Sequence, residues 1–152
     1  MKNFLIIILS LFLMLVNVFV NGVKFGDYFS TCISYNVSLN GVVEDINLNS
    51  IENGEFTHIF TSINNYSYIN KTYGDNIISQ TFEFNKTFNL CKFFNDINFK
   101  RIKEYELGSM VIIEGYSNKF NDYIINDGQK TNIQVCIGNS IKIGYPYILE
   151  SF

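Results

Sequence analysis

Hydrophobic and polar residues alternate in several short runs of this chain, which predicts β-strands. In the clearest run, residues 33–39, every second residue is apolar, and the run ends at Asn40-Gly41, the strongest two-residue hairpin signal. Outward pairing from this turn predicts four opposed pairs: Leu39 with Val42, Val37 with Glu44, Tyr35 with Ile46 and Ile33 with Leu48. Seven of these eight residues are apolar, so we expect this face to be buried. The opposite face, with Cys32, Ser34, Asn36, Ser38 and Asn47, is expected to be wet.

A second hairpin is predicted near the C-terminus. If Gly138-Asn139-Ser140 is a three-residue loop, three apolar pairs face each other: Ile137 with Ile141, Val135 with Ile143 and Ile133 with Tyr145. Further strand candidates, rich in β-branched and aromatic residues, are 56–63, 79–84 and 110–116. Residues 123–126 with the turn Asp127-Gly128 add another hairpin, although outward pairing from this turn would oppose the charged Asp122 to Ile133.

Residues 95–107 are the one serious helix candidate. Asn95 or Asp96 could cap such a helix and Gly108 could end it, whereas Phe99 interrupts its apolar stripe and fits a strand as well. Short strands with regular turn signals predict a mainly β fold. We therefore expect an antiparallel β-sandwich or partly open barrel built from hairpins, with at most one short helix at about 95–107.

The first 22 residues have the form of a secretory signal peptide. Lys2 precedes an apolar run over 4–20, and Gly22 provides a small residue at a cleavage site before Val23. The alternative is an uncleaved membrane anchor, but Ser10 and Asn17 interrupt the run. We expect a signal peptide at 1–22, a single β-rich extracellular domain at 23–152 and a secreted protein.

The charge of the domain argues against some partners. Removal of Lys2 leaves 10 basic and 14 acidic residues, so the net charge changes from −3 to 10 − 14 = −4. Such a domain does not favour nucleic acid or anionic lipid. The one basic cluster, at 100–103, is followed at once by Glu104 and Glu106 and is expected to be a solvated, compensated surface. A membrane is a partner only if the N-terminal segment stays uncleaved.

Three cysteines in a secreted chain predict one disulfide and one free thiol, or a bond to another chain. The candidates are Cys32, Cys91 and Cys136. Cys32 and Cys136 lie on the polar faces of their predicted strands, so they can pair only if those strands are near neighbours in one sheet. His58, the only histidine, is expected to be an ordinary strand residue, because metal and Cys-His sites need several such groups together.

Four N-glycosylation sequons follow the signal segment, at Asn36, Asn65, Asn70 and Asn85, and Asn89-Leu90-Cys91 is a weak fifth. With 18 Asn and 18 Ser or Thr in residues 23–152, random order gives about 2.5 sequons. Their number is therefore only slightly raised. Asn36 is expected to carry a glycan because it lies on the polar face of the first hairpin.

The chain contains no phosphate-binding glycine loop, no Gly-x-Ser-x-Gly sequence and no CxxC pair, and no cofactor, metal or catalytic residue is predicted. We expect a non-enzymatic binding or structural protein of a matrix, coat or adhesive surface, with an extracellular glycan or protein as partner. One alternative is a secreted hydrolase with a carboxylate pair. The absence of Trp, which often lines glycan clefts, weighs against it, although Tyr can substitute. Another alternative is a signal-anchored ectodomain.

Overall fold

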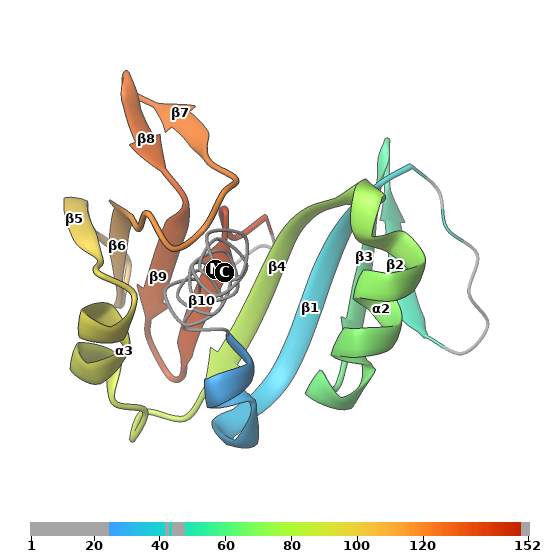
Figure 1. Cartoon of the computed structure of the whole chain (residues 1–152), viewed down its shortest axis with the longest axis horizontal. Coiled ribbons are helices and arrows are strands. Elements are labelled where there is room, and N and C mark those ends of the chain that lie inside the picture. Colours follow the sequence, from blue (N-terminus) through green and yellow to red (C-terminus); the bar gives the residue numbers. More distant parts are fainter. Residues whose placement is uncertain (1–24, 42, 44–47, 150–152) are drawn as a thin grey trace, which may run out of the picture.

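The computed structural model describes residues 25–41, 43 and 48–149, so the predicted signal peptide lies outside the described part. Eight strands form one antiparallel sheet in the order β2-β3-β1-β4-β10-β9-β6-β5 (Figure 1). Their bounds are β1 (Cys32–Asn40), β2 (Asn49–Asn53), β3 (Phe56–Thr61), β4 (Ile77–Phe84), β5 (Lys100–Leu107), β6 (Met110–Tyr116), β9 (Ile133–Ile137) and β10 (Ile141–Tyr145). A separate two-stranded ribbon consists of β7 (Ile124–Asn126) and β8 (Gln129–Thr131). The prediction of a mainly β fold is confirmed.

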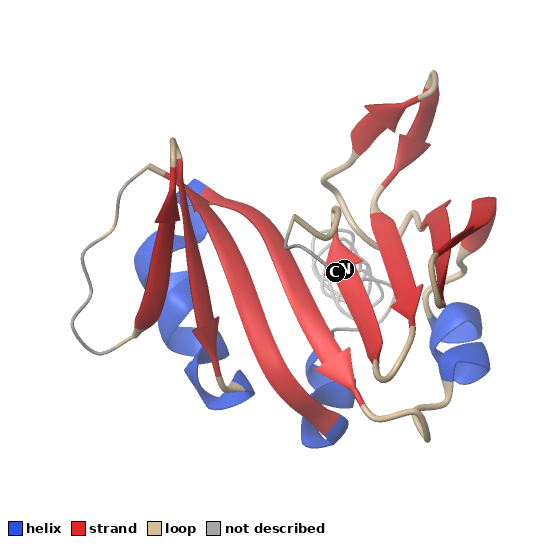
Figure 2. Cartoon of the chain, turned by 180° about the vertical axis from the view of Figure 1, so that it is seen from behind, coloured by secondary structure: helices blue, strands red, loops and turns tan. Residues whose placement is uncertain are grey.

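The helices are short and lie at one side of the sheet. They are α2 (Tyr66–Tyr73), α3 (Leu90–Asp96) and the 3-10 segments η1 (Phe25–Thr31), η2 (Ile63–Asn65) and η3 (Gly74–Asn76). Figures 1 and 2, which view the sheet from opposite sides, show the helices over the same face. In the described part of the chain, none of the helices has the length and apolar character needed to cross a membrane.

The helix predicted at 95–107 does not form. Helix α3 ends at Asp96, Asn98 adopts a positive φ of 52°, and the chain then enters β5. Strand β5 pairs with β6 through a tight turn in which Gly108 has a φ of 62°. Glycine adopts that conformation without steric cost, so Gly108 forms the turn between the two strands instead of ending a helix.

The hairpin predicted at Asn40-Gly41 is wrong. Both edges of β1 are occupied by other strands, because Val37 lies opposite Ile59 of β3 and opposite Gln80 of β4. The amide of Gly41 donates to the carbonyl of Glu55 at 2.8 Å, which joins this end of β1 to β3. Three of the predicted partners, Val42, Glu44 and Ile46, lie outside the described residues, and Leu48 precedes β2. A two-residue turn instead joins β2 to β3 at Gly54-Glu55.

The predicted apolar face of β1 is correct for three of its four residues. Tyr35, Val37 and Leu39 are fully buried, whereas Ile33 is 52 % exposed. The ladder between β1 and β4 shifts between Cys32 and Ser34, and this irregularity takes Ile33 off the buried face. The opposite face is not wet throughout, because Ser38 is buried and its hydroxyl bonds to Nδ1 of His58 at 2.8 Å.

The other two hairpins are confirmed. Strands β9 and β10 pair with Ile137 opposite Ile141 and Val135 opposite Ile143, as the loop at 138–140 predicts. The ladder ends at Gln134 opposite Gly144, so the third predicted pair, Ile133 with Tyr145, lies beyond it. The ribbon of β7 and β8 turns at Asp127-Gly128, and Asn126 lies opposite Gln129. This ribbon ends at Ile124 and Thr131, before the unfavourable pair of Asp122 and Ile133.

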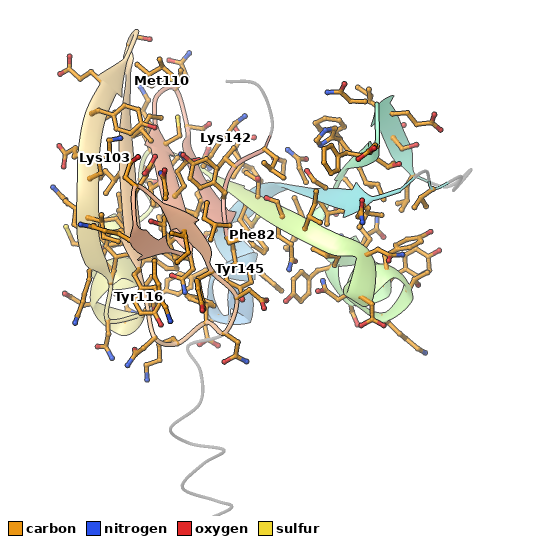
Figure 3. All side chains as sticks on the ribbon, turned by 90° about the horizontal axis from the view of Figure 1, so that it is seen from above. Phe82, Lys103, Met110, Tyr116, Lys142 and Tyr145 are labelled. Carbon is orange, nitrogen blue, oxygen red and sulfur yellow. The ribbon has the colours of Figure 1, made fainter. Side chains whose placement is uncertain are left out.

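The two faces of the sheet are covered differently. The main core lies under the helices and combines strand residues such as Phe82 and Val135 with Ile69 of α2 and Phe93 of α3. On the other face, a smaller cluster of Ile112, Cys136 and Ile148 is covered by the segment that follows β10. Seen from above, the sheet twists between the strands that carry the labelled residues Lys103 and Met110 and the strands at its other end (Figure 3).

Candidate functional site

A groove lies where η1 meets the connection from β4 to α3. It has a volume of about 550 Å³, within the usual range of ligand sites. Figure 1 shows η1 and this connection beside each other at the same end of the sheet. The groove is lined by Tyr28, Ser30, Thr31, Cys32, Ile33, Asn85, Thr87, Phe88 and Asn89.

One wall of the groove is η1, which aromatic contacts hold against α3. The Tyr28 ring meets Phe93 edge-on, with 5.3 Å between ring centroids, and meets Phe88 at 5.5 Å. The Tyr28 hydroxyl donates a hydrogen bond to the Asp96 carboxylate. The Thr31 hydroxyl donates to the carbonyl of Tyr28 at 2.9 Å, which closes the end of η1. These contacts position the hydroxyl-bearing residues of η1 at the groove.

The other wall is the segment 85–89. Its turn is closed by the amide of Phe88, which donates to the carbonyl of Asn85 at 2.9 Å. The Phe88 ring stacks on Phe84, with 4.2 Å between centroids. Asn89 is the N-cap of α3, where its side-chain oxygen accepts a hydrogen bond of 2.9 Å from the amide of Lys92. Both walls are therefore fixed by packing and hydrogen bonds.

The lining is uncharged and combines polar groups with a larger apolar surface, to which Ile33 contributes. Hydroxyl groups come from Ser30, Thr31 and Thr87, amides from Asn85 and Asn89, and aromatic surface from Tyr28 and Phe88. Such groups exchange hydrogen bonds with hydroxyls and amides and stack on apolar faces, and they offer no counter-ion to a charged ligand. This groove therefore suits a neutral, hydroxyl-rich molecule.

The thiol of Cys32 lines this groove but is not activated. Burial raises the pKa of the thiol, and the thiol donates to the carbonyl of Ser34 at 3.0 Å. A thiol with a raised pKa stays protonated at neutral pH and is a poor nucleophile. Cys32 therefore contributes shape and a weak hydrogen-bond donor to the groove.

The three cysteines are all free thiols in the structure. Cys32 lies on β1 and Cys136 on β9, and β4 and β10 separate these strands, so the neighbour condition for their pairing is not met. Cys91 is exposed on α3. Cys136 is buried rather than on a wet face, and its sulfur lies 3.5 Å from Sδ of Met110.

The four sequon asparagines occupy different surroundings. Asn36 is half-buried within β1. The Asn65 amide donates to the Thr61 hydroxyl at 2.6 Å, and the Asn70 amide donates to the carbonyl of Tyr66 at 2.9 Å. Asn65 and Asn70 are also half-buried, whereas Asn85 is exposed. Only one of the four acceptors is therefore fully exposed, and it lines the groove.

A second polar group of residues, on the opposite face of the sheet, was not predicted from the sequence. The carboxyl group of Glu114 on β6 is 2 % exposed and accepts four hydrogen bonds. The donors are Tyr105 at 3.0 Å, Tyr147 at 2.8 Å, Asn126 at 2.9 Å and Gln134 at 3.3 Å. The available signal was a single carboxylate in the apolar run at 110–116.

The partners of Glu114 indicate a structural role. They come from β5, β9, the β7–β8 ribbon and the segment after β10, so one carboxyl group joins four parts of the chain. Burial raises the pKa of Tyr147, and the adjacent Glu114 carboxyl raises it further. The tyrosine therefore remains a hydrogen-bond donor over the ordinary pH range.

Sequence reasoning also missed four residues of the groove, Tyr28, Ser30, Thr31 and Phe88, because single polar and aromatic residues in turns carry no sequence signal. His58 is a strand residue on β3, as its position predicts, and the structure adds a hydrogen bond between its Nδ1 and the Ser38 hydroxyl. In the described part of residues 25–149, no group of three or more His, Cys, Asp or Glu side chains is close enough to hold a metal ion.

The chain matches no protein-family model, no curated protein and no solved structure.

Proposed function

We propose that this protein is a non-enzymatic binding module whose groove at η1 takes a neutral, hydroxyl-rich ligand, an extracellular glycan. The observation that carries this proposal is the lining of the groove, which combines hydroxyls, amides and two aromatic rings without a charged side chain. Oligosaccharides present hydroxyl groups beside apolar ring faces, which these side chains complement. The secreted location and N-glycosylation expected from the sequence belong to the same proposal.

The alternative of a hydrolase receives less support from this groove. Glycosidases need two carboxyl groups on either side of the scissile bond. The groove lining contains no Asp or Glu. Among the described residues, the most buried carboxyl group is that of Glu114. It lies on the opposite face of the sheet, where it accepts four side-chain hydrogen bonds.

Titration of the protein, produced without N-glycans, with neutral oligosaccharides tests the proposed ligand class. Mannohexaose, cellohexaose and chitohexaose are suitable probes, with binding measured by calorimetry and by chemical-shift changes. At least one probe should bind and shift signals from residues 28–31 and 85–89. Glucuronic-acid oligomers, which are anionic, should bind more weakly, because the side chains that line the groove include no cation.

A matched pair of variants tests the location of the ligand. Ser30→Glu places a larger, charged side chain in the groove and should abolish binding, whereas Ser50→Glu makes the same change on exposed β2 and should leave binding intact. Equal binding by both variants would show that the groove is not the site.

The secreted location has its own test. Expression of the full chain in a eukaryotic secretory host should release a protein whose N-terminus, determined by mass spectrometry, begins at or near Val23. Recovery of the intact chain from the membrane fraction would instead support the anchored form.

A further inference from the structure

We propose that an N-linked glycan on Asn85 occupies the groove at η1 and regulates access to it. The proposal deepens the proposed function, because it assigns the groove a ligand attached to the protein itself. The affinity of the groove for sugars rests on the proposed function. The attachment of a glycan rests on the sequon at Asn85 and on the exposed turn that contains it.

Asn85 is the acceptor that the fold presents best. It lies directly after β4 in an exposed turn, and its sequon partner Thr87 is exposed as well. The other three acceptors are half-buried, and the side chains of Asn65 and Asn70 already donate hydrogen bonds to neighbouring residues. Because the folded domain accommodates a bulky glycan without rearrangement only at an exposed position, Asn85 is the favoured site.

The position of Asn85 places the attached sugar at the groove. Asn85 and Thr87 both line the cavity, so the first sugar is attached at its wall. A volume of about 550 Å³ is large enough for a few sugar rings. Attachment also gives the glycan a high effective concentration, on the order of millimolar for a short flexible link. A weak intrinsic affinity is therefore sufficient to fill the groove.

Lys86, between these two residues, allows a sharp test. Proline at the middle position of a sequon prevents glycosylation, so Lys86→Pro removes the glycan and leaves both groove-lining side chains in place. Lys86 is the second residue of the turn closed by Phe88, a position that favours proline. Its amide makes no backbone hydrogen bond within the described chain. Lys86→Ala keeps the sequon and is the matched control, and Asn85→Gln is a second unglycosylated variant.

The rate at which the Cys32 thiol is alkylated measures access to the groove without any added ligand. This half-buried thiol lines the cavity, whereas Cys91 is exposed on α3 and serves as an internal reference. Full-length variants secreted from a eukaryotic host would be treated with N-ethylmaleimide, and peptide mass spectrometry would follow both cysteines. In Lys86→Pro and Asn85→Gln, Cys32 should react several-fold faster than in Lys86→Ala, with Cys91 unchanged. If Cys32 proves unreactive in every variant, hydrogen exchange of residues 28–33 gives the same comparison, with faster exchange expected without the glycan.

The outcomes separate the two proposals. Absence of a glycan on Asn85 in Lys86→Ala, or equal protection of residues 28–33 in Lys86→Ala and Lys86→Pro, would overturn this inference and leave oligosaccharide binding by the unglycosylated protein to be judged separately. If the glycan protects Cys32 or residues 28–33 but no free oligosaccharide binds, the result would support the glycan on Asn85 as the occupant of the groove and contradict the proposed function. Protection together with binding only in the unglycosylated variants would support both.

Discussion

The hydroxyl of Tyr147 donates a hydrogen bond of 2.8 Å to the carboxyl group of Glu114, although the two residues are 33 positions apart in the chain. This contact holds the segment after β10 against the face of the sheet opposite the helices. Ile148, the next residue, is buried there, and its amide donates to Gln134 at 3.2 Å. The C-terminal part of the domain is therefore fixed by polar contacts as well as by packing.

Replacement of Tyr147 by Phe should destabilise the domain by about 1–3 kcal/mol, because a buried acceptor loses one of its donors. Urea unfolding followed by circular dichroism measures this change. Tyr123→Phe is the matched control, since Tyr123 is 45 % exposed and should change stability by less than about 0.5 kcal/mol. Equal stability of the two variants would show that the contact with Glu114 contributes nothing.

Two residues of β1 should differ sharply in their response to truncation. Tyr35 is fully buried, so Tyr35→Ala should cost about 3–5 kcal/mol through lost burial and a cavity. Ile33 is 52 % exposed, and Ile33→Ala should cost no more than about 0.5 kcal/mol. Denaturant unfolding of both variants tests the irregularity at the start of β1. A large loss for Ile33→Ala would mean that the alternation continues regularly through residue 33.

Gly144 on β10 should not tolerate a side chain. A β-carbon at this position would lie 2.6 Å from the backbone nitrogen of Ile148, closer than atoms can pack. Gly144→Ala should therefore destabilise the domain by about 1–3 kcal/mol. Gly74→Ala, where the added carbon meets open space, should be neutral or stabilise by up to about 1 kcal/mol. Thermal unfolding of the pair checks the close approach of the C-terminal segment.

Alkaline pH should weaken the fold through Tyr145. Burial raises the pKa of Tyr145 from 10.0 to about 12, and its hydroxyl donates to the Asp122 carboxylate at 2.9 Å. The folded state therefore holds this proton more tightly than the unfolded state. The resulting stability is complete below pH 10 and is lost as the pH rises from 10 to 12.

Unfolding free energies measured between pH 9 and 12 test this effect. Tyr145→Phe removes the ionisable group and should make the decline shallower than in the unchanged protein. A decline of the same slope in both proteins would show that other groups account for the alkaline loss.

Local sequence patterns determined those parts of the fold in which neighbouring strands follow one another in the chain. The loop at 138–140 and the turn at Asp127-Gly128 set the registers of their hairpins, because a short connection leaves few ways to pair the flanking strands. The alternation in 33–39 likewise identified Tyr35, Val37 and Leu39 as buried residues. The mainly β class follows from these signals.

Tertiary structure alone decided which strands lie beside β1, and which residues form the groove. Asn40-Gly41 has the composition of a hairpin turn, but β1 pairs with β3 on one edge and with β4 on the other. Pairing between strands that are far apart in the chain leaves no local sequence signal. For the same reason, the sequence could not show that η1 and residues 85–89 lie together. Their polar side chains become a site only because the packing of Tyr28, Phe88 and Phe93 joins segments more than 50 residues apart.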